Sequence, residues 1–203
     1  METPLHVIYH VYPKTKSWHS AMDCFIFHSL NLARERQKEI ETRRHSVMDE
    51  QRVVCPHCNE INTIPLQEHY SEADCTHCKA SLLETKPLSV DEAAFMKHIW
   101  NSDIVVIVDF WAPWCGPCRT MAPAFEEAAA ALPMKARFLK VDTDAQKLLA
   151  ARYNIRSVPT LILFKNGYEI NRRSRAMSVE ELQKWTGKYI ARCNAYSQVA
   201  DSR

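Results

Sequence analysis

Residues 108–118 read Val-Asp-Phe-Trp-Ala-Pro-Trp-Cys-Gly-Pro-Cys, and this stretch decides the fold class. It begins inside a nearly continuous apolar run, residues 104–110, whose length suits a central strand buried on both faces. A helix is expected to follow from about 115 to 132, with a kink at Pro123. The two cysteines that end the quoted stretch therefore lie at a predicted strand-to-helix junction.

Strand and helix signals alternate on both sides of this junction. Before it, Ser89-Val-Asp-Glu92 has the pattern of a capping box and predicts a helix through residue 100. The elements predicted after it are a strand over 137–141, a helix over 145–153, a hairpin of strands 160–165 and 168–172, and a last helix opened by Ser178-Val-Glu-Glu181. This order predicts an α/β domain over residues 86–203, with a mixed sheet covered by helices on both faces.

The cysteine pair at 115 and 118 carries the predicted chemistry. Cys115 stands at the positive end of the helix, where unpaired N–H groups favour the thiolate. Cys118, one turn later, is expected to be more buried and a poorer first nucleophile. Cys115 is thus predicted to attack a substrate disulfide, and Cys118 to resolve the mixed disulfide. Pro117 between them lacks an N–H, which costs little at a helix start, and it makes the loop rigid.

Two charged residues near the pair are candidates for proton transfer. Asp109 lies in the apolar run, where burial would raise its pKa and let it accept the Cys118 proton through water; the alternative is a solvent-facing carboxylate. Lys140, in the next predicted strand, is its candidate partner, with a surface lysine as the alternative. Trp114 is expected to be exposed and Trp111 to be packed.

Four further cysteines form two Cys-x-x-Cys pairs upstream, Cys55/Cys58 and Cys75/Cys78, separated by sixteen residues. Two such turns at this distance supply four sulfurs for a tetrahedral Zn²⁺ site. The surrounding segment, residues 48–85, has few large apolar side chains, so one structural zinc ion would supply much of its folding free energy. The alternative is a redox-active disulfide, because Cys55-Pro-His-Cys58 alone resembles the motif of strongly oxidising thiol oxidases. The matching second pair favours zinc.

Three blocks of the sequence stand in the order of a known family: residues 108–118, Tyr-Asn-Ile-Arg-Ser-Val-Pro-Thr at 153–160 and Phe-Lys-Asn-Gly at 164–167. On these blocks, residues 86–196 resemble the thioredoxin family. With the cysteine-rich segment in front, residues from about 48 to 196 resemble the zinc-containing bacterial thioredoxin-2 type. The resemblance implies the thioredoxin fold preceded by a small zinc ribbon.

The resemblance also implies a substrate-binding surface beside the cysteine pair. Pro159 is expected to be cis and to face Cys115, so that the Val158 backbone meets an extended substrate segment. The implied substrate-binding residues are Trp114, Gly116, Pro117, Val158 and Pro159.

The implied activity is that of a cytoplasmic protein-disulfide reductase acting as a monomer. The implied reductant is a flavin-containing, NADPH-dependent thioredoxin reductase, and the implied substrates include ribonucleotide reductase, peroxiredoxins and methionine sulfoxide reductases. Two alternatives stay open. One is a thiol oxidant or isomerase in an oxidising compartment, and the other is a zinc-dependent binding or chaperone-like module whose dithiol acts as a redox sensor.

The composition of the 203 residues excludes other classes of protein. A net charge of +2 does not indicate the strongly basic surface that is typical of nucleic-acid binding. No apolar stretch of the sequence approaches the ~18–20 residues of a membrane span. The N-terminus has no pattern of a secretory signal, so a cytoplasmic location is expected.

Residues 1–47 differ from the rest, with five of the nine histidines and a dense mixture of charges. They are predicted to be a disordered or loosely helical extension, with the alternative that they do not belong to the natural protein. Cys24 and Cys193 have no predicted role.

One position departs from the thioredoxin family, in which a glycine normally precedes the alanine after the last strand. Here that position is Arg175. The alternatives are a side chain turned to solvent and a changed partner choice that favours acidic surfaces.

Overall fold

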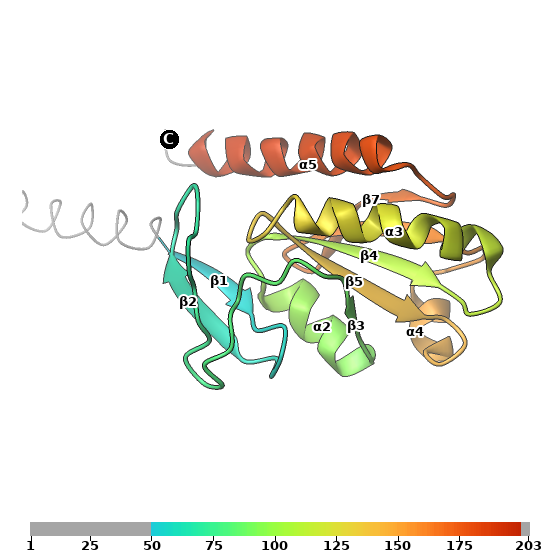
Figure 1. Ribbon diagram of the computed structural model, residues 1–203, viewed down its shortest axis with the longest axis horizontal. Helices are drawn as coiled ribbons and strands as arrows, with labels where there is room; N and C mark the ends of the chain where they lie inside the picture. The colour runs from blue at the N-terminus through green and yellow to red at the C-terminus, as the bar shows by residue number, and fades with distance from the viewer. Residues whose placement is uncertain (1–49, 200–203) are drawn as a thin grey trace, which may run out of the picture. The chain divides into compact units, whose positions relative to one another are not determined.

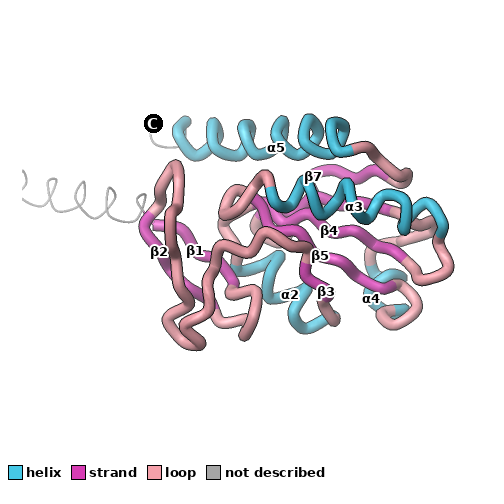
Figure 2. The backbone as a smooth tube through the Cα atoms, viewed as in Figure 1, coloured by secondary structure: helices cyan, strands magenta, loops and turns pink. Residues whose placement is uncertain are grey.

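The computed structural model describes residues 50–199, and their side chains as far as residue 191 (Figure 1). The predictions for residues 1–47, which include Cys24, and for the side chain of Cys193 fall outside this part. A five-stranded sheet with helices on both faces and a separate two-stranded hairpin make up the described chain (Figure 2). No helix over residues 50–199 combines the length and the apolar character that a membrane span requires.

The main sheet is mixed, as the order of predicted elements requires. Its strands stand in the order β3-β5-β4-β6-β7; β3, β5 and β4 are parallel, and β6 and β7 are antiparallel to their neighbours. The bounds are β3 Leu88–Ser89, β4 Val105–Trp111, β5 Ala136–Asp142, β6 Thr160–Lys165 and β7 Tyr168–Arg173. The apolar run of the sequence therefore becomes the central strand of the sheet.

Helices cover both faces of this sheet, and alternate side chains of β4 enter two separate cores. Figure 1 shows α3 and α5 over one face and α2 and α4 over the other. The bounds are α2 Glu92–Asn101, α3 Gly116–Ala130, α4 Lys147–Arg152 and α5 Val179–Val199. Val105 and Ile107 pack under α3 and α5, whereas Val106 and Val108 pack under α2 and α4. Asp109 follows the alternation of Val105 and Ile107, so its side chain lies on the α3 face.

The two predicted capping boxes have different outcomes. The second is confirmed: the Ser178 N–H donates to Glu181 at 3.1 Å, and the Glu181 N–H donates back to the Ser178 hydroxyl at 3.3 Å. The first is wrong, because Ser89 is held in β3 by pairing with β5. Asp91 caps α2 instead, and its carboxylate accepts a hydrogen bond from the Ala94 N–H at 2.8 Å.

The predicted hairpin turn at Asn166-Gly167 is confirmed. Both residues have positive φ, 52° and 82°, as the tight turn requires. The Gly167 N–H donates to the Ile99 carbonyl at 2.7 Å, which holds the turn against the end of α2. The Trp100 indole occupies the space that a Cβ at residue 167 would need.

We expect Gly167→Ala to destabilise the protein by about 1–2 kcal/mol, because alanine is strained at positive φ and its Cβ would overlap the Trp100 ring. Denaturant unfolding of the variant and the wild type measures the difference. Gly187→Ala is the matched control: a Cβ there meets no atom within 4 Å, and alanine is the better helix former by about 1 kcal/mol. Equal unfolding free energies for the two variants would contradict this account of the turn.

The segment before the main sheet contains a two-stranded hairpin and two similar Cys-x-x-Cys turns, at 55–58 and 75–78, which we call knuckles. Its strands are β1 Glu50–Val54 and β2 Ile61–Pro65, which are antiparallel. In each knuckle the N–H of the first cysteine donates to the carbonyl five residues later, at 2.8 Å. The residue after the second cysteine has a positive φ, 60° at Asn59 and 63° at Lys79. The two Cys-x-x-Cys turns therefore have the same backbone geometry.

The hairpin packs directly onto the α/β domain. The Arg52 guanidinium and backbone N–H donate to the Asp103 carboxylate at 2.7–3.2 Å, and the Asp103 N–H donates back to the Arg52 carbonyl at 2.8 Å. Ile104 and Met134 of the domain join the small apolar core under the knuckles. The hairpin thus shares its core with the domain, which compensates for its small number of apolar side chains.

Candidate functional site

The redox cysteines lie where β4 leads into α3. Cys115 is the N-cap of α3, and its Sγ accepts a hydrogen bond from the Cys118 N–H at 3.1 Å. The two residues form a disulfide in this structure. Each is 3% exposed, so the predicted difference in burial is wrong for the disulfide form. The physical reason is that two bonded sulfurs lie under one common cover.

Side chains from two separate parts of the chain bury the disulfide, one at the end of β4 and one in the loop before β6. Trp111, Ala112 and Val158 pack against the two cysteines. The Val158–Pro159 peptide bond is cis, as the resemblance implies, and Pro159 is buried while Val158 is half-buried. The predicted substrate-binding loop is therefore next to the redox pair.

Trp114 forms the exposed rim of this site, as expected, with 68% of its surface accessible. Its indole Nε1 donates to the Asp144 carboxylate at 2.9 Å. Pro117 is also exposed and Gly116 is half-buried. The sequence reasoning missed Asp144. Asp144 could have been found because the parallel strands β4 and β5 end at the same edge of the sheet, which brings together the residues that follow each strand.

Asp109 is 1% exposed on the α3 face of β4, as the buried-base interpretation predicts. Its Oδ1 has no hydrogen-bond partner. Burial raises the pKa of Asp109 from 3.8 to about 7, and the positive charge of Lys140 opposes this shift. Lys140 lies opposite Asp109 in β5, and its Nζ is 4.9 Å from the ring centroid of Trp111. The site therefore contains a buried carboxyl group that can exchange a proton near neutral pH.

Arg175 lies beyond the end of β7 and is held by an ion pair. Its two terminal nitrogens donate to the two carboxylate oxygens of Glu181 at 3.0 and 2.9 Å. About half of each side chain is accessible to solvent. The guanidinium is thus fixed on the first turn of α5, and the effect of Arg175 on partner choice stays a prediction.

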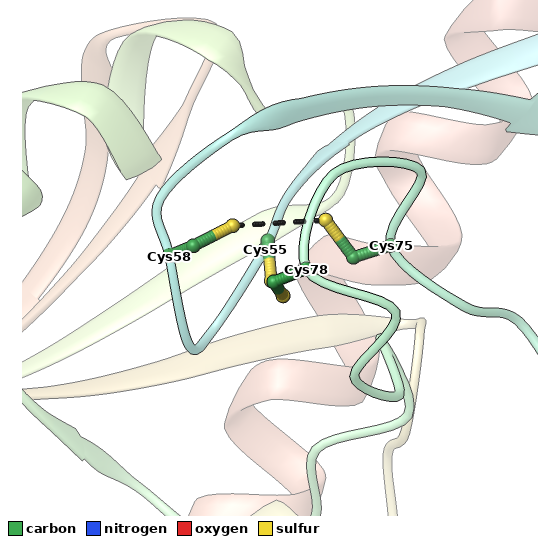
Figure 3. Close-up of side chains that lie close together, drawn as sticks. All are labelled: Cys55, Cys58, Cys75 and Cys78. Carbon is green, nitrogen blue, oxygen red and sulfur yellow. Dashed lines mark hydrogen bonds between the residues drawn. The ribbon is translucent and has the colours of Figure 1, made fainter.

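The four upstream cysteines meet in one cluster (Figure 3). All four sulfurs lie within 4.8 Å of one another, and the Cys55–Cys78 and Cys58–Cys75 pairs are each 3.7 Å apart. None of the four is in a disulfide. The structure therefore brings together the complete predicted ligand set from two separate turns.

Two of the sulfur–sulfur distances, Cys55–Cys78 and Cys58–Cys75, match the edge of a tetrahedral zinc site. A Zn–S bond of about 2.3 Å implies a sulfur–sulfur edge of about 3.8 Å. Hydrogen bonds from the backbone of Cys78 and His77 lower the pKa of Cys75 to about 6, whereas burial raises the pKa of Cys55 to about 12. Four thiolates this close would repel one another without a cation between them, so a metal cation is the group that this cluster suits.

Asn62 is a supporting residue that the sequence reasoning missed. Its side chain is buried in β2, where Nδ2 lies 3.5 Å from the Cys75 Sγ and 3.0 Å from the Glu60 carbonyl. Its Oδ1 accepts a hydrogen bond from the Thr76 N–H at 2.8 Å. Asn62 therefore joins the two Cys-x-x-Cys turns and holds the sulfur of Cys75, one of the four predicted ligands. The signal that could have found Asn62 was its position two residues before Ile64, on the same face of a short strand.

Comparisons with known proteins relate this chain to one family. A family model described as Thioredoxin matches residues 86–188. Thioredoxin C-3 of Corynebacterium nephridii is 40% identical over 138 residues, which are 68% of this chain and 94% of that protein. The thioredoxin of Porphyra purpurea is 39% identical over 102 residues, 50% of this chain and 95% of that protein.

A solved structure of a thioredoxin variant from Halobacterium salinarum is 32% identical, with a TM-score of 0.49 over 52% of this chain and 92% of that one. The family-model match covers half of the chain, and the bacterial relative is covered almost completely. The chain belongs to the thioredoxin family, the oxidoreductases that reduce protein disulfides by thiol–disulfide exchange.

Proposed function

We propose that this chain is a cytoplasmic protein-disulfide reductase in which Cys115 attacks, Cys118 resolves and a tetrathiolate zinc site stabilises the N-terminal hairpin. The observation that carries the proposal is the position of the Cys115–Cys118 pair. It lies at the N-terminus of α3, next to the exposed Trp114 and packed against Val158, the residue that precedes cis Pro159. In the proposed reaction, the Cys115 sulfur meets an extended segment of the protein substrate at this place.

The reaction transfers two electrons from the reduced pair to a substrate disulfide. The Cys115 thiolate attacks one substrate sulfur, so a mixed disulfide forms and the other substrate sulfur leaves as a thiolate. The Cys118 thiolate then attacks the Cys115 sulfur, which releases the second substrate thiolate. The protein is left with the Cys115–Cys118 disulfide that the structure contains. The N–H groups at the start of α3 favour the thiolate of Cys115 in the first step.

Asp109 is the proposed proton acceptor for Cys118. Its carboxyl group is buried on the face that α3 covers, and its pKa is raised to about 7 by that burial. A group with this pKa accepts the thiol proton through water when Cys118 becomes the nucleophile, and it returns the proton to solvent afterwards. Lys140, opposite Asp109, has a secondary electrostatic role in this proposal.

The proposed partners follow from membership of the family. Thioredoxins act with a thioredoxin reductase and with disulfide substrates, and we propose an NADPH-dependent flavin-containing reductase as the electron donor here. Ribonucleotide reductase, peroxiredoxins and methionine sulfoxide reductases are the proposed substrates. We propose that the protein acts as a monomer.

Two observations support the zinc-containing subtype. The four sulfurs lie within 4.8 Å of one another, and two of their distances, 3.7 Å each, match the edge of a tetrahedral zinc site. The 138 residues aligned with Thioredoxin C-3 also outnumber those from position 86 to the C-terminus, so that match includes part of the upstream segment. Cys55, Cys58, Cys75 and Cys78 would hold the ion. Zinc would neutralise part of the thiolate charge and hold the two knuckles together, with no role in electron transfer.

Zinc content and free-thiol count, measured in reduced and mildly oxidised protein, test this division between the cysteines. We expect one zinc ion per chain in both samples and the loss of two thiols on oxidation, because Cys115–Cys118 is the pair that forms a disulfide among the cysteines whose side chains the structure describes. The Cys115→Ser/Cys118→Ser double variant is the control and should lose no thiols while keeping its zinc. A reduced protein without zinc would refute the zinc site, and a wild type that loses no thiols would refute the redox pair.

A further inference from the structure

Arg137 is an unusual residue for the centre of a domain. It lies in β5, is only 2% exposed, and is the largest fully buried side chain of the described chain. Among residues 50–191 no carboxylate is within ion-pair distance of its guanidinium. A buried charge without a partner is costly, so Arg137 calls for a compensating negative group.

The Arg137 guanidinium reaches from the α/β domain into the cysteine hairpin. Nη2 donates to the Leu82 carbonyl at 3.1 Å, and Nε has no hydrogen-bond partner. Leu82 belongs to the apolar core under the knuckles, together with Cys55 and Cys75. The Arg137 guanidinium therefore reaches the backbone of the apolar core that contains Cys55 and Cys75, and it is shielded from solvent.

The surroundings keep Arg137 charged. Burial lowers the pKa of Arg137 to about 10, which still leaves the guanidinium charged at neutral pH, and the negative charge of Glu84 opposes that shift. His98 on α2 is 1% exposed, and burial together with the Arg137 charge lowers its pKa to about 3. At neutral pH the imidazole is uncharged, so the buried region contains one positive charge, that of Arg137.

Four thiolates around one Zn²⁺ leave two net negative charges. We propose that Arg137 compensates this charge, so that a residue of the redox domain sets the zinc affinity of the N-terminal hairpin. The inference rests on the proposed zinc site and identifies a positioning residue for it. In this proposal the buried guanidinium needs no carboxylate partner, because its partner is the tetrathiolate centre as a whole. In a buried region such a charge interaction is screened much less than at the surface.

Zinc affinity, measured by competition with a chromophoric chelator, tests this assignment in the full chain. We expect Arg137→Met to weaken zinc binding by about 10- to 100-fold, the range typical for residues that support metal ligands. Arg137→Lys keeps the charge and should recover part of the affinity. Arg52→Met is the matched control: Arg52 also joins hairpin and domain, but its side chain is 52% exposed and its charge is paired with Asp103. It should change zinc affinity by less than about threefold.

Thermal unfolding of the zinc-free proteins separates charge compensation from a general structural role. Without zinc the buried guanidinium lacks its proposed partner, so zinc-free Arg137→Met should be at least as stable as the zinc-free wild type. A zinc-binding wild type with unchanged affinity in Arg137→Met would overturn this inference alone. Equal losses of zinc affinity in Arg137→Met and Arg52→Met would overturn it as well. So would a zinc-free Arg137→Met that is clearly less stable than the zinc-free wild type. A wild type that binds no zinc would overturn the proposed zinc site itself.

Discussion

Cys115→Ser is expected to reduce the rate of insulin-disulfide reduction to the uncatalysed background. A serine hydroxyl is not ionised near neutral pH, so the variant has no nucleophile at the position where α3 favours an anion. Turbidity or thiol release with dithiothreitol as the reductant measures the rate. This is the largest effect that we predict, because the first bond of the reaction no longer forms.

Two further variants show whether the loss is specific to the first step. Cys118→Ser still has the attacking sulfur, so it should accumulate a mixed disulfide with the substrate, visible by mass spectrometry. Replacement of Cys55 and Cys58 should leave the reductase rate largely intact at temperatures where the variant stays folded, since their sulfurs lie in a separate cluster. Full dependence of the activity on Cys55 and Cys58 would instead favour a zinc-dependent binding module.

Asp109→Asn is expected to slow disulfide reduction by about 10- to 100-fold near pH 7 and, at the same time, to stabilise the protein. The rate falls because an amide cannot accept the Cys118 proton. The stability rises because the wild-type carboxylate is buried without a full set of hydrogen bonds. With a folded pKa of about 7 against an ordinary 3.8, the expected gain above pH 7 is on the order of a few kcal/mol.

The pH dependence of unfolding checks the sign of this effect. Between about pH 4 and pH 7 the folded Asp109 binds more protons than the unfolded one, so wild-type stability falls as the pH rises through this window. The Asp109→Asn curve should lack that part of the slope, and the gap between the two curves should be widest above pH 7. Asp144→Asn is the control, because Asp144 is exposed and an amide oxygen can still accept the Trp114 hydrogen bond. A wild-type curve parallel to that of Asp109→Asn would show that Asp109 is not a buried titrating group.

Much of the fold was predictable because its signals are local. The hairpin turn follows from the conformational freedom of Asn166-Gly167, and the second capping box from hydrogen bonds within one turn of helix. The central strand followed from its apolar run. The first capping box failed for a non-local reason: pairing with β5 drew Ser89 into the sheet, which left Asp91 as the cap.

The candidate site divides in a similar way. Cysteine spacing is a local property, and it was enough to separate the redox pair from the four knuckle cysteines. The contacts of Trp114 with Asp144 and of Arg175 with Glu181 could not be predicted, because no short sequence motif links the two residues of either pair. The burial of Cys115 depends on Val158, which approaches from a loop far along the chain.

The sequence alone was enough to predict the fold family, to single out the Cys115–Cys118 pair and to predict four sulfur ligands, because each is encoded within a short segment or a fixed spacing. Only the tertiary structure decided what surrounds those groups. It joined the cysteine hairpin to the redox domain through Arg52 and Asp103, and it buried Arg137 of β5 against the Leu82 carbonyl of the cysteine segment. An arginine in a strand has no sequence signal for burial, since its environment is created by packing between segments about fifty residues apart.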